Sequence, residues 1–78
     1  MGEYAEAETR LKHALQLFER LETRWQIGRT LFELGELALA QVNTSAARDH
    51  FSRALAAFEV MQAAPDAERT RAILESLA

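Results

Sequence analysis

The chain has 78 residues, of which 49% are hydrophobic and 27% charged, and its net charge is −3. A chain of this length forms at most one small domain, and three glycines with a single proline favour helices over turn-rich β structure. The lack of cysteine excludes a disulfide framework and a thiolate metal cluster, and the scattered charges argue against nucleic acid as a partner.

The longest apolar runs span only a few residues, as at 37–40, and no signal-peptide pattern opens the sequence. We therefore expect a cytoplasmic protein that is neither inserted in a membrane nor anchored to one.

The first predicted helix covers residues 3–22, where apolar residues recur at steps of three and four between charged ones. Its stripe consists of Tyr4, Ala7, Leu11, Ala14, Phe18 and Leu21, and Leu15 widens it. The stripe spans about a third of the circumference, which is enough for two neighbouring helices. Only the next helix can cover it, so we expect part of the stripe to stay open in a monomer. Such a surface favours a symmetric homodimer through the first helix, with Tyr4, Leu11, Leu15 and Phe18 as the self-association residues.

The second predicted helix covers residues 25–41 and has an apolar arc wide enough to lie between two neighbours. Its main line is Ile27, Leu31, Leu34 and Ala38, and the arc is extended by Gly28, Phe32, Gly35 and Leu39. A glycine inside a helix costs about 1 kcal/mol relative to alanine. We therefore expect the two glycines to let a neighbouring helix approach closely.

The sequence VNTSAA interrupts this pattern with three residues that suit a helix N-cap, namely Asn43, Thr44 and Ser45. A third helix is predicted to begin there, with an apolar stripe of Ala47, Phe51, Ala54, Leu55, Phe58 and Met61. Pro65 ends this helix and suits the first turn of a fourth one at about 66–77, with buried Ala67, Ile73, Leu74 and Leu77. Loops this short make successive helices antiparallel neighbours.

The two halves of the sequence match each other at a shift of forty residues. Within the first and third helices the matching pairs are Ala7 with Ala47, Leu11 with Phe51, Ala14 with Ala54, Leu15 with Leu55 and Phe18 with Phe58. The register continues into the next helices, where Arg29 matches Arg69, Thr30 matches Thr70 and Leu34 matches Leu74. One spacing that holds across two helices and a loop indicates an internal repeat of helix pairs, and such pairs stack into a solenoid to hide their apolar faces.

This pattern resembles the tetratricopeptide repeat family. The family spacing of Leu-Gly, small residue, aromatic residue and Ala is met by Leu34, Gly35, Ala47, Phe51 and Ala54, and the first copy matches it through Gly2, Tyr4, Ala7, Leu11, Ala14 and Leu15. The chain departs from the family in its period of forty instead of about 34, in Leu31 where Trp is common and in Glu59 where Pro is expected. The longer period is similar to the extended repeats of bacterial signalling ATPases and transcriptional activators.

The resemblance implies an all-α fold of antiparallel helix pairs in a short right-handed solenoid of about four helices. It divides the chain into a half repeat at 1–24, a full repeat at 25–64 and an incomplete repeat at 65–78. The chain then opens at the second helix of a pair, so we expect it to be an excerpt of a longer array. In the family the first helix of each pair lines a concave groove, a role that falls here on Arg29, Phe32, Glu33, Glu36, Leu39, Arg69 and Ile73.

Helical geometry agrees with this groove, because Arg29, Glu33 and Glu36 lie opposite the buried line of the same helix. Two alternatives remain open within it. Phe32 and Leu39 either anchor a peptide or pack on the fourth helix. The two arginines, Arg29 and Arg69, either hold a carboxylate of a ligand or pair with nearby glutamates such as Glu33.

No catalytic, cofactor or metal site is expected. His13 and His50 are predicted to be solvated surface residues, because no nucleophile and carboxylate accompany them. Carboxylates two residues apart, as in Glu6 and Glu8, do not converge on a cation. Tyr4 and Trp25 suit stacking on bases, but their positions favour core or helix-staple roles.

The sequence as a whole predicts a non-enzymatic scaffold, part of a larger signalling or regulatory protein, that binds a protein or peptide through its concave face. The alternative is a structural spacer or self-association module without a groove ligand.

Overall fold

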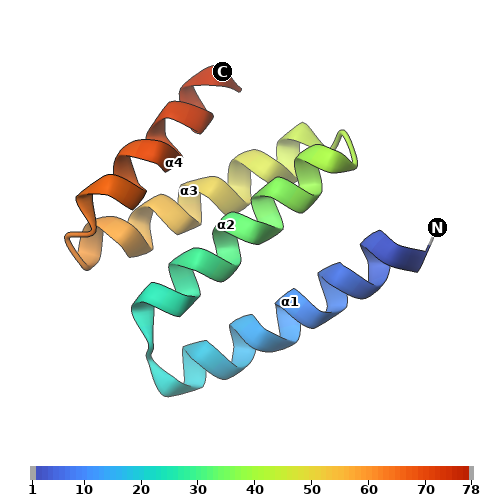
Figure 1. The fold of residues 1–78 in the computed structure, drawn as a ribbon, viewed down its shortest axis with the longest axis horizontal. Helices are drawn as coiled ribbons and strands as arrows, with labels where there is room; N and C mark the ends of the chain where they lie inside the picture. Colours follow the sequence, from blue (N-terminus) through green and yellow to red (C-terminus); the bar gives the residue numbers. More distant parts are fainter. Residues whose placement is uncertain (1, 78) are drawn as a thin grey trace.

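The computed structural model describes residues 2–77, which form four α-helices joined by short turns (Figure 1). The helices are α1 (Gly2–Leu21), α2 (Arg24–Ala40), α3 (Thr44–Val60) and α4 (Ala64–Ser76). Each helix runs antiparallel to the one before it and packs mainly on its neighbours in the sequence, so the body is flat, 37 × 32 × 15 Å. The predicted all-α fold of antiparallel helix pairs is confirmed.

The three turns share one backbone geometry. Each contains a residue with positive φ, namely Glu22 at 56°, Val42 at 56° and Gln62 at 62°. The next residue donates its backbone N–H to the carbonyl five residues earlier, in the pairs Thr23 to Phe18, Asn43 to Ala38 and Ala63 to Phe58, at 3.1, 2.8 and 2.9 Å. This Schellman closure satisfies carbonyls that the helix end leaves unpaired. Because identical turns recur every twenty residues, α1 corresponds to α3 and α2 to α4 at the forty-residue shift.

The helix starts follow the predicted signals. The Asn43 side chain caps α3 by accepting a hydrogen bond from the Ala46 N–H at 3.2 Å. Pro65 lies in the first turn of α4, where its missing N–H leaves no helical hydrogen bond unmade. That helix begins at Ala64, slightly earlier than the sequence predicted.

The two glycines of α2 allow the rings of α3 to pack directly on its backbone. A Cβ atom at Gly28 would lie 2.7 Å from Cε1 of Phe58, and one at Gly35 would lie 2.8 Å from ring atoms of Phe51. Both rings are enclosed, with exposed fractions of 3% for Phe58 and 0% for Phe51. The predicted close approach at these glycines is confirmed.

The core has two parts that meet at Phe32. The first contains buried residues from all four helices: Leu15, Leu31, Leu34, Ala54, Phe58 and Ala67. The second lies between α2 and α3 and contains Ala38, Ala47 and Phe51. Phe32 packs against both parts. Ile73, Leu74 and Leu77, which were predicted to be buried, are only half-buried, because they cover one side of the second part from the outermost helix.

Other predicted environments differ from those observed. Trp25 and Tyr4 are not core residues, because they are 42% and 49% exposed; the exposure of Tyr4 agrees instead with its place in the part of the α1 stripe that was expected to stay open. His50 is not a solvated surface residue. It is half-buried beside a small hollow of about 40 Å³ that residues of α1 and α2 also line. Its Nδ1 atom is buried and has no hydrogen-bond partner among the described residues.

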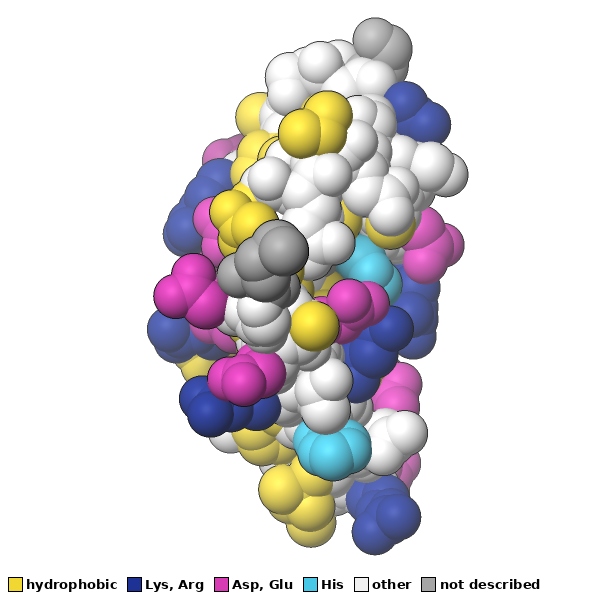
Figure 2. Space-filling view, turned by 90° about the vertical axis from the view of Figure 1, so that its right-hand side faces the viewer, with side chains coloured by type: hydrophobic (Ala, Val, Ile, Leu, Met, Phe, Trp, Pro, Cys, Tyr) yellow, Lys and Arg dark blue, Asp and Glu magenta, His cyan; other side chains and the backbone are white. Residues whose placement is uncertain are grey.

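The outer surface mixes charge types. Figure 2 looks onto the side that carries the N-terminal end of α1 and the turn between α2 and α3, and there basic, acidic and apolar side chains are interspersed. Within residues 2–77, no helix combines the length and the apolar character needed to cross a membrane.

Candidate partner-binding groove

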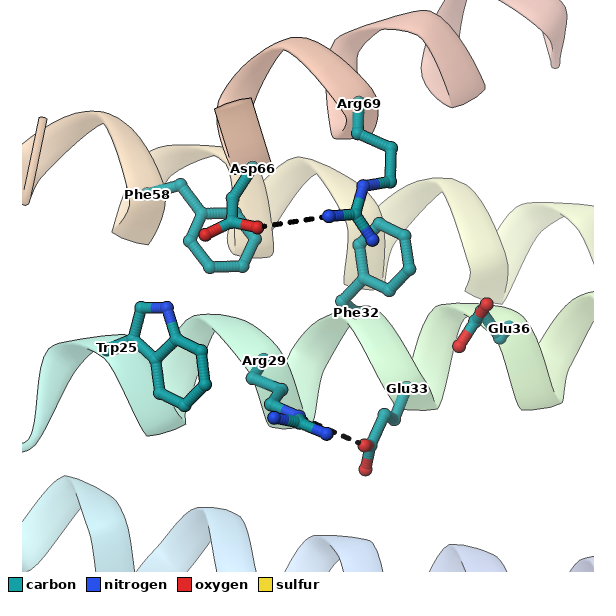
Figure 3. Close-up of a pocket in the computed structure, with 8 residues that line it drawn as sticks. All are labelled: Trp25, Arg29, Phe32, Glu33, Glu36, Phe58, Asp66 and Arg69. Carbon is teal, nitrogen blue, oxygen red and sulfur yellow. Dashed lines mark hydrogen bonds and ion pairs between the residues drawn. The ribbon is translucent and has the colours of Figure 1, made fainter. Parts of the chain in front are cut away.

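A hollow of about 340 Å³ lies between α2 and α4, and we call it the α2–α4 groove (Figure 3). Its lining comes mostly from α2, with two residues from α4 and one from α3: Trp25, Arg29, Phe32, Glu33, Glu36, Phe58, Asp66 and Arg69. The α2 residues recur at steps of three and four, which places them on one face of that helix. The glycines and leucines of α2 hold this face outward because they occupy the sides packed on α1 and α3.

Each arginine of the groove is held by an aromatic ring and a carboxylate. The guanidinium carbon of Arg29 lies 5.4 Å from the centroid of the Trp25 ring, and its Nε lies 3.5 Å from Glu33 Oε1. On α4, the guanidinium of Arg69 lies 5.8 Å from the Phe32 centroid. Figure 3 shows both guanidiniums beside the hollow.

The carboxylate partner of Arg69 is Asp66, at 3.4 Å between Nη2 and Oδ1. The side chains of Arg29 and Arg69 are 62% and 65% exposed. Ion pairs this exposed contribute at most about 1 kcal/mol, and an exposed cation–π contact contributes about 0.5–1 kcal/mol. The two arginines are thus oriented by weak contacts that a ligand carboxylate can replace.

Phe32 belongs to the core and to the groove at once. Its ring meets that of Phe51 edge-on, with 5.1 Å between centroids and 77° between planes. Its other side faces the groove under Arg69. The groove therefore has an apolar base of Phe32, Phe58 and Trp25 with charged residues at its edges.

The groove brings together five of the seven residues that the family resemblance assigned to it: Arg29, Phe32, Glu33, Glu36 and Arg69. The other two lie outside it. Leu39 is further along α2 and 36% exposed, and Ile73 is half-buried against Phe51 and its neighbours. Sequence reasoning missed three residues of the groove: Trp25, Phe58 and Asp66. Phe58 was assigned only to the stripe of the third helix, whereas Trp25 and Asp66 each precede a groove arginine at helical spacing, by four and three residues.

The residues assigned to self-association do not all reach the surface. Tyr4 is exposed and Leu11 and Phe18 are half-buried, but Leu15 is only 8% exposed and belongs to the core. It points to α2, so it is not available to a second copy. Two exposed leucines of α1 lie outside the assigned set: Leu21, at 60%, was predicted as part of the stripe, and Leu17, at 51%, was missed.

No group of three or more His, Asp or Glu side chains within residues 2–77 is placed to hold a metal ion. The fold and the groove together define a small helical-repeat domain with an open, mixed apolar and charged groove. Residues 1–59, most of the chain, match the family model of the tetratricopeptide repeat. The chain belongs to this family, whose members are generally protein–protein interaction modules. No curated protein and no solved structure gives a significant match.

Proposed function

We propose that this chain binds a peptide segment of a partner protein in the α2–α4 groove, as one part of a larger signalling or regulatory protein of the extended-repeat type. The observation that supports this most is the pair of ring-stacked arginines, Arg29 and Arg69, on either side of an apolar base. An open groove of this kind suits a peptide better than a small metabolite, which needs an enclosed pocket with most of its surface buried.

The charges of the groove indicate which peptide fits. Arg29 and Arg69 make only long ion pairs, at 3.5 and 3.4 Å, with carboxylates of their own helices. A peptide carboxylate can accept from both guanidiniums without leaving either arginine buried and unpaired. Glu36 makes no ion pair within the described residues and lies beyond Glu33 along α2. The proposed peptide therefore has an acidic residue next to an apolar one, and a basic residue toward Glu36.

A peptide-display selection tests this proposal. We expect the chain to enrich peptides that combine Asp or Glu with an aromatic or aliphatic neighbour. The variant Arg29→Glu/Arg69→Glu should lose this enrichment and keep its melting temperature, since both side chains are mostly exposed. The matched control is Arg10→Glu/Arg20→Glu on α1, away from the groove, which should select the same peptides as the parent.

Two results count against the groove. The first is selection of the same peptides by the parent and the Arg29→Glu/Arg69→Glu variant. The second is failure of the parent to enrich any peptide, which favours the spacer or self-association alternative.

A further inference from the structure

The small hollow beside His50 brings together side chains of three consecutive helices. His50 of α3 and Glu8 of α1 both line this space of about 40 Å³, which lies at the C-terminal end of α2. The rest of its lining is uncharged: Leu34, Leu37, Ala38, Gln41, Asn43 and Ala46. The hollow shares no residue with the α2–α4 groove, so its chemistry is independent of the proposed peptide binding.

The imidazole of His50 is enclosed on the side that carries Nδ1. This atom is buried and has no hydrogen-bond partner among the described residues. In the neutral ring only one of the two nitrogens carries a hydrogen, whereas the imidazolium carries one on each. Nδ1 is therefore a donor whenever His50 is charged, and a buried charged donor requires an acceptor within reach.

Within the described lining of the hollow, Glu8 alone carries a carboxylate. Its Oε2 atom lies 2.8 Å from Nζ of Lys12, one turn further along α1. The hydrogen bond from Lys12 lowers the pKa of Glu8 below its ordinary value of 4.5, so Glu8 is ionised at the pH at which a histidine takes up a proton. Both side chains of this pair are about half exposed, and an exposed pair contributes little, so it is readily exchanged.

The corresponding position on α3 already reaches the end of the next helix. At the forty-residue shift, Glu8 corresponds to Arg48 and Leu37 corresponds to Leu77. Arg48 donates a hydrogen bond to the carbonyl oxygen of Leu77, at the end of α4, at 3.0 Å. A cation suits the negative end of a helix. Glu8 instead brings a negative charge to the corresponding end of α2, so a positive charge on His50 is favourable there.

We infer that protonation of His50 moves the Glu8 carboxylate from Lys12 to Nδ1 of His50 and so joins α1 to α3 by an ion pair. The proton comes from solvent, and the ammonium of Lys12, whose side chain is 55% exposed, returns to water. Among the described residues, the other ion pair between these two helices is Arg53 with Glu19, at 3.9 Å. The hollow is thus a pH-dependent connection between the corresponding helices of successive pairs.

The charges that face the ring come from its own helix and from α1. Burial has the largest effect and lowers the pKa of His50. On α3, Asp49 raises this pKa and Arg53 lowers it; on α1, Lys12 lowers it and Glu8 raises it. The part of α2 and the turn that line the hollow contribute no titratable group. The exchange offsets part of the effect of burial, because Glu8 approaches the ring as Lys12 leaves its carboxylate.

Titration of the histidine ring signals by NMR tests the exchange in the intact chain. We expect Glu8→Gln to lower the pKa of His50 by about half a unit or more, because the charged ring loses its acceptor. Lys12→Gln should raise this pKa, because Glu8 then has no competing partner. The matched control is Glu6→Gln, which removes an exposed carboxylate of the same helix outside the hollow. It should shift the pKa by no more than about 0.2 unit at physiological salt.

The carboxyl carbon of Glu8 reports the exchange in the parent. We expect its chemical shift to change at the pKa of His50, well above the pH at which Glu8 itself titrates. Three results overturn the inference. The first is an equal effect of Glu8→Gln and Glu6→Gln on the pKa of His50. The second is a pKa that Lys12→Gln does not raise, and the third is a Glu8 carboxyl signal that stays constant while His50 titrates.

Discussion

The helices α2 and α4 correspond at the forty-residue shift, yet they are built for different surroundings. α2 buries Gly28, Thr30, Leu31, Leu34, Gly35 and Ala38, whereas α4 buries only Ala67 and Thr70. The difference rests on few positions. Where α2 has glycines that receive the rings of α3, α4 has Glu68 and Glu75. The two corresponding helices thus differ at two positions that determine how closely the rings of a neighbouring helix can approach the backbone.

Among the contacts that distinguish α2 from α4, the contact of Phe51 with Gly35 is expected to contribute most to the free energy of unfolding. Phe51 is fully buried, and its ring fills the space that the missing Cβ of Gly35 leaves. We expect Phe51→Ala to lower the free energy of unfolding by about 3–5 kcal/mol, measured by denaturant unfolding. The control is Leu11→Ala at the corresponding, half-buried position of α1. Similar losses in the two variants would show that α3 is no better packed than α1.

Substitution of Gly35, on the other side of the same contact, is expected to have the second largest effect on the free energy of unfolding. In Gly35→Ala the added Cβ lies 2.8 Å from three atoms of a buried ring, so the ring has to move. Overpacking of this kind costs about 1–3 kcal/mol and opposes the helix-propensity gain of about 1 kcal/mol. We expect a net loss of stability. Glu75→Ala, the corresponding change on α4, should alter the free energy of unfolding by no more than about 0.5 kcal/mol. A stabilised Gly35→Ala variant would contradict the assigned packing.

The sequence predicted the fold well because helix patterns, caps and repeats are local signals. The spacing of apolar residues, Asn43, Pro65 and the two glycines each act within a few residues or through one neighbouring helix. The forty-residue match also predicted which helices correspond.

The groove was harder to predict from the sequence because its members come from three helices. The hydrophobicity of Trp25 alone predicts a core residue. Its exposure is a result of the position of α4, which lies beside α2 but does not cover this side chain. The burial of His50 likewise depends on how α1 and α2 pack around α3. Such consequences of tertiary packing leave no periodic signal in the chain.

The three turns share one backbone geometry, and glycine substitutions test whether this geometry costs the same free energy at each site. Val42 is β-branched and has a φ of 56°. This backbone conformation costs a residue other than glycine about 1–2 kcal/mol. It is 86% exposed, so its removal sacrifices little burial. We expect Val42→Gly to raise the free energy of unfolding by about 0.5–1 kcal/mol, read as a higher denaturant midpoint. Gln62→Gly, in the matching turn before α4, should gain less because its side chain is not β-branched.

The smallest expected effect concerns His50, which occupies the inner part of the molecule although the corresponding residue of α1, Arg10, is exposed. Burial lowers the pKa of His50 below its ordinary value of 6.5, and Arg53 and Lys12 lower it further, while Asp49 and Glu8 oppose them. The folded state therefore binds a proton less readily than the unfolded chain. The contribution of His50 to stability is therefore complete when the pH lies above the pKa of this residue in the unfolded chain. It decreases as the pH falls through about 6.5 toward the lower pKa in the folded state.

We expect His50→Gln to flatten the pH dependence of the melting temperature in this window relative to the parent. His13→Gln is the control, since His13 is exposed and does not line the hollow. The quantity compared is the difference in melting temperature between the two variants at pH values just above and just below 6.5. Parallel curves for the two variants would mean that His50 is as well solvated in the folded chain as in the unfolded one.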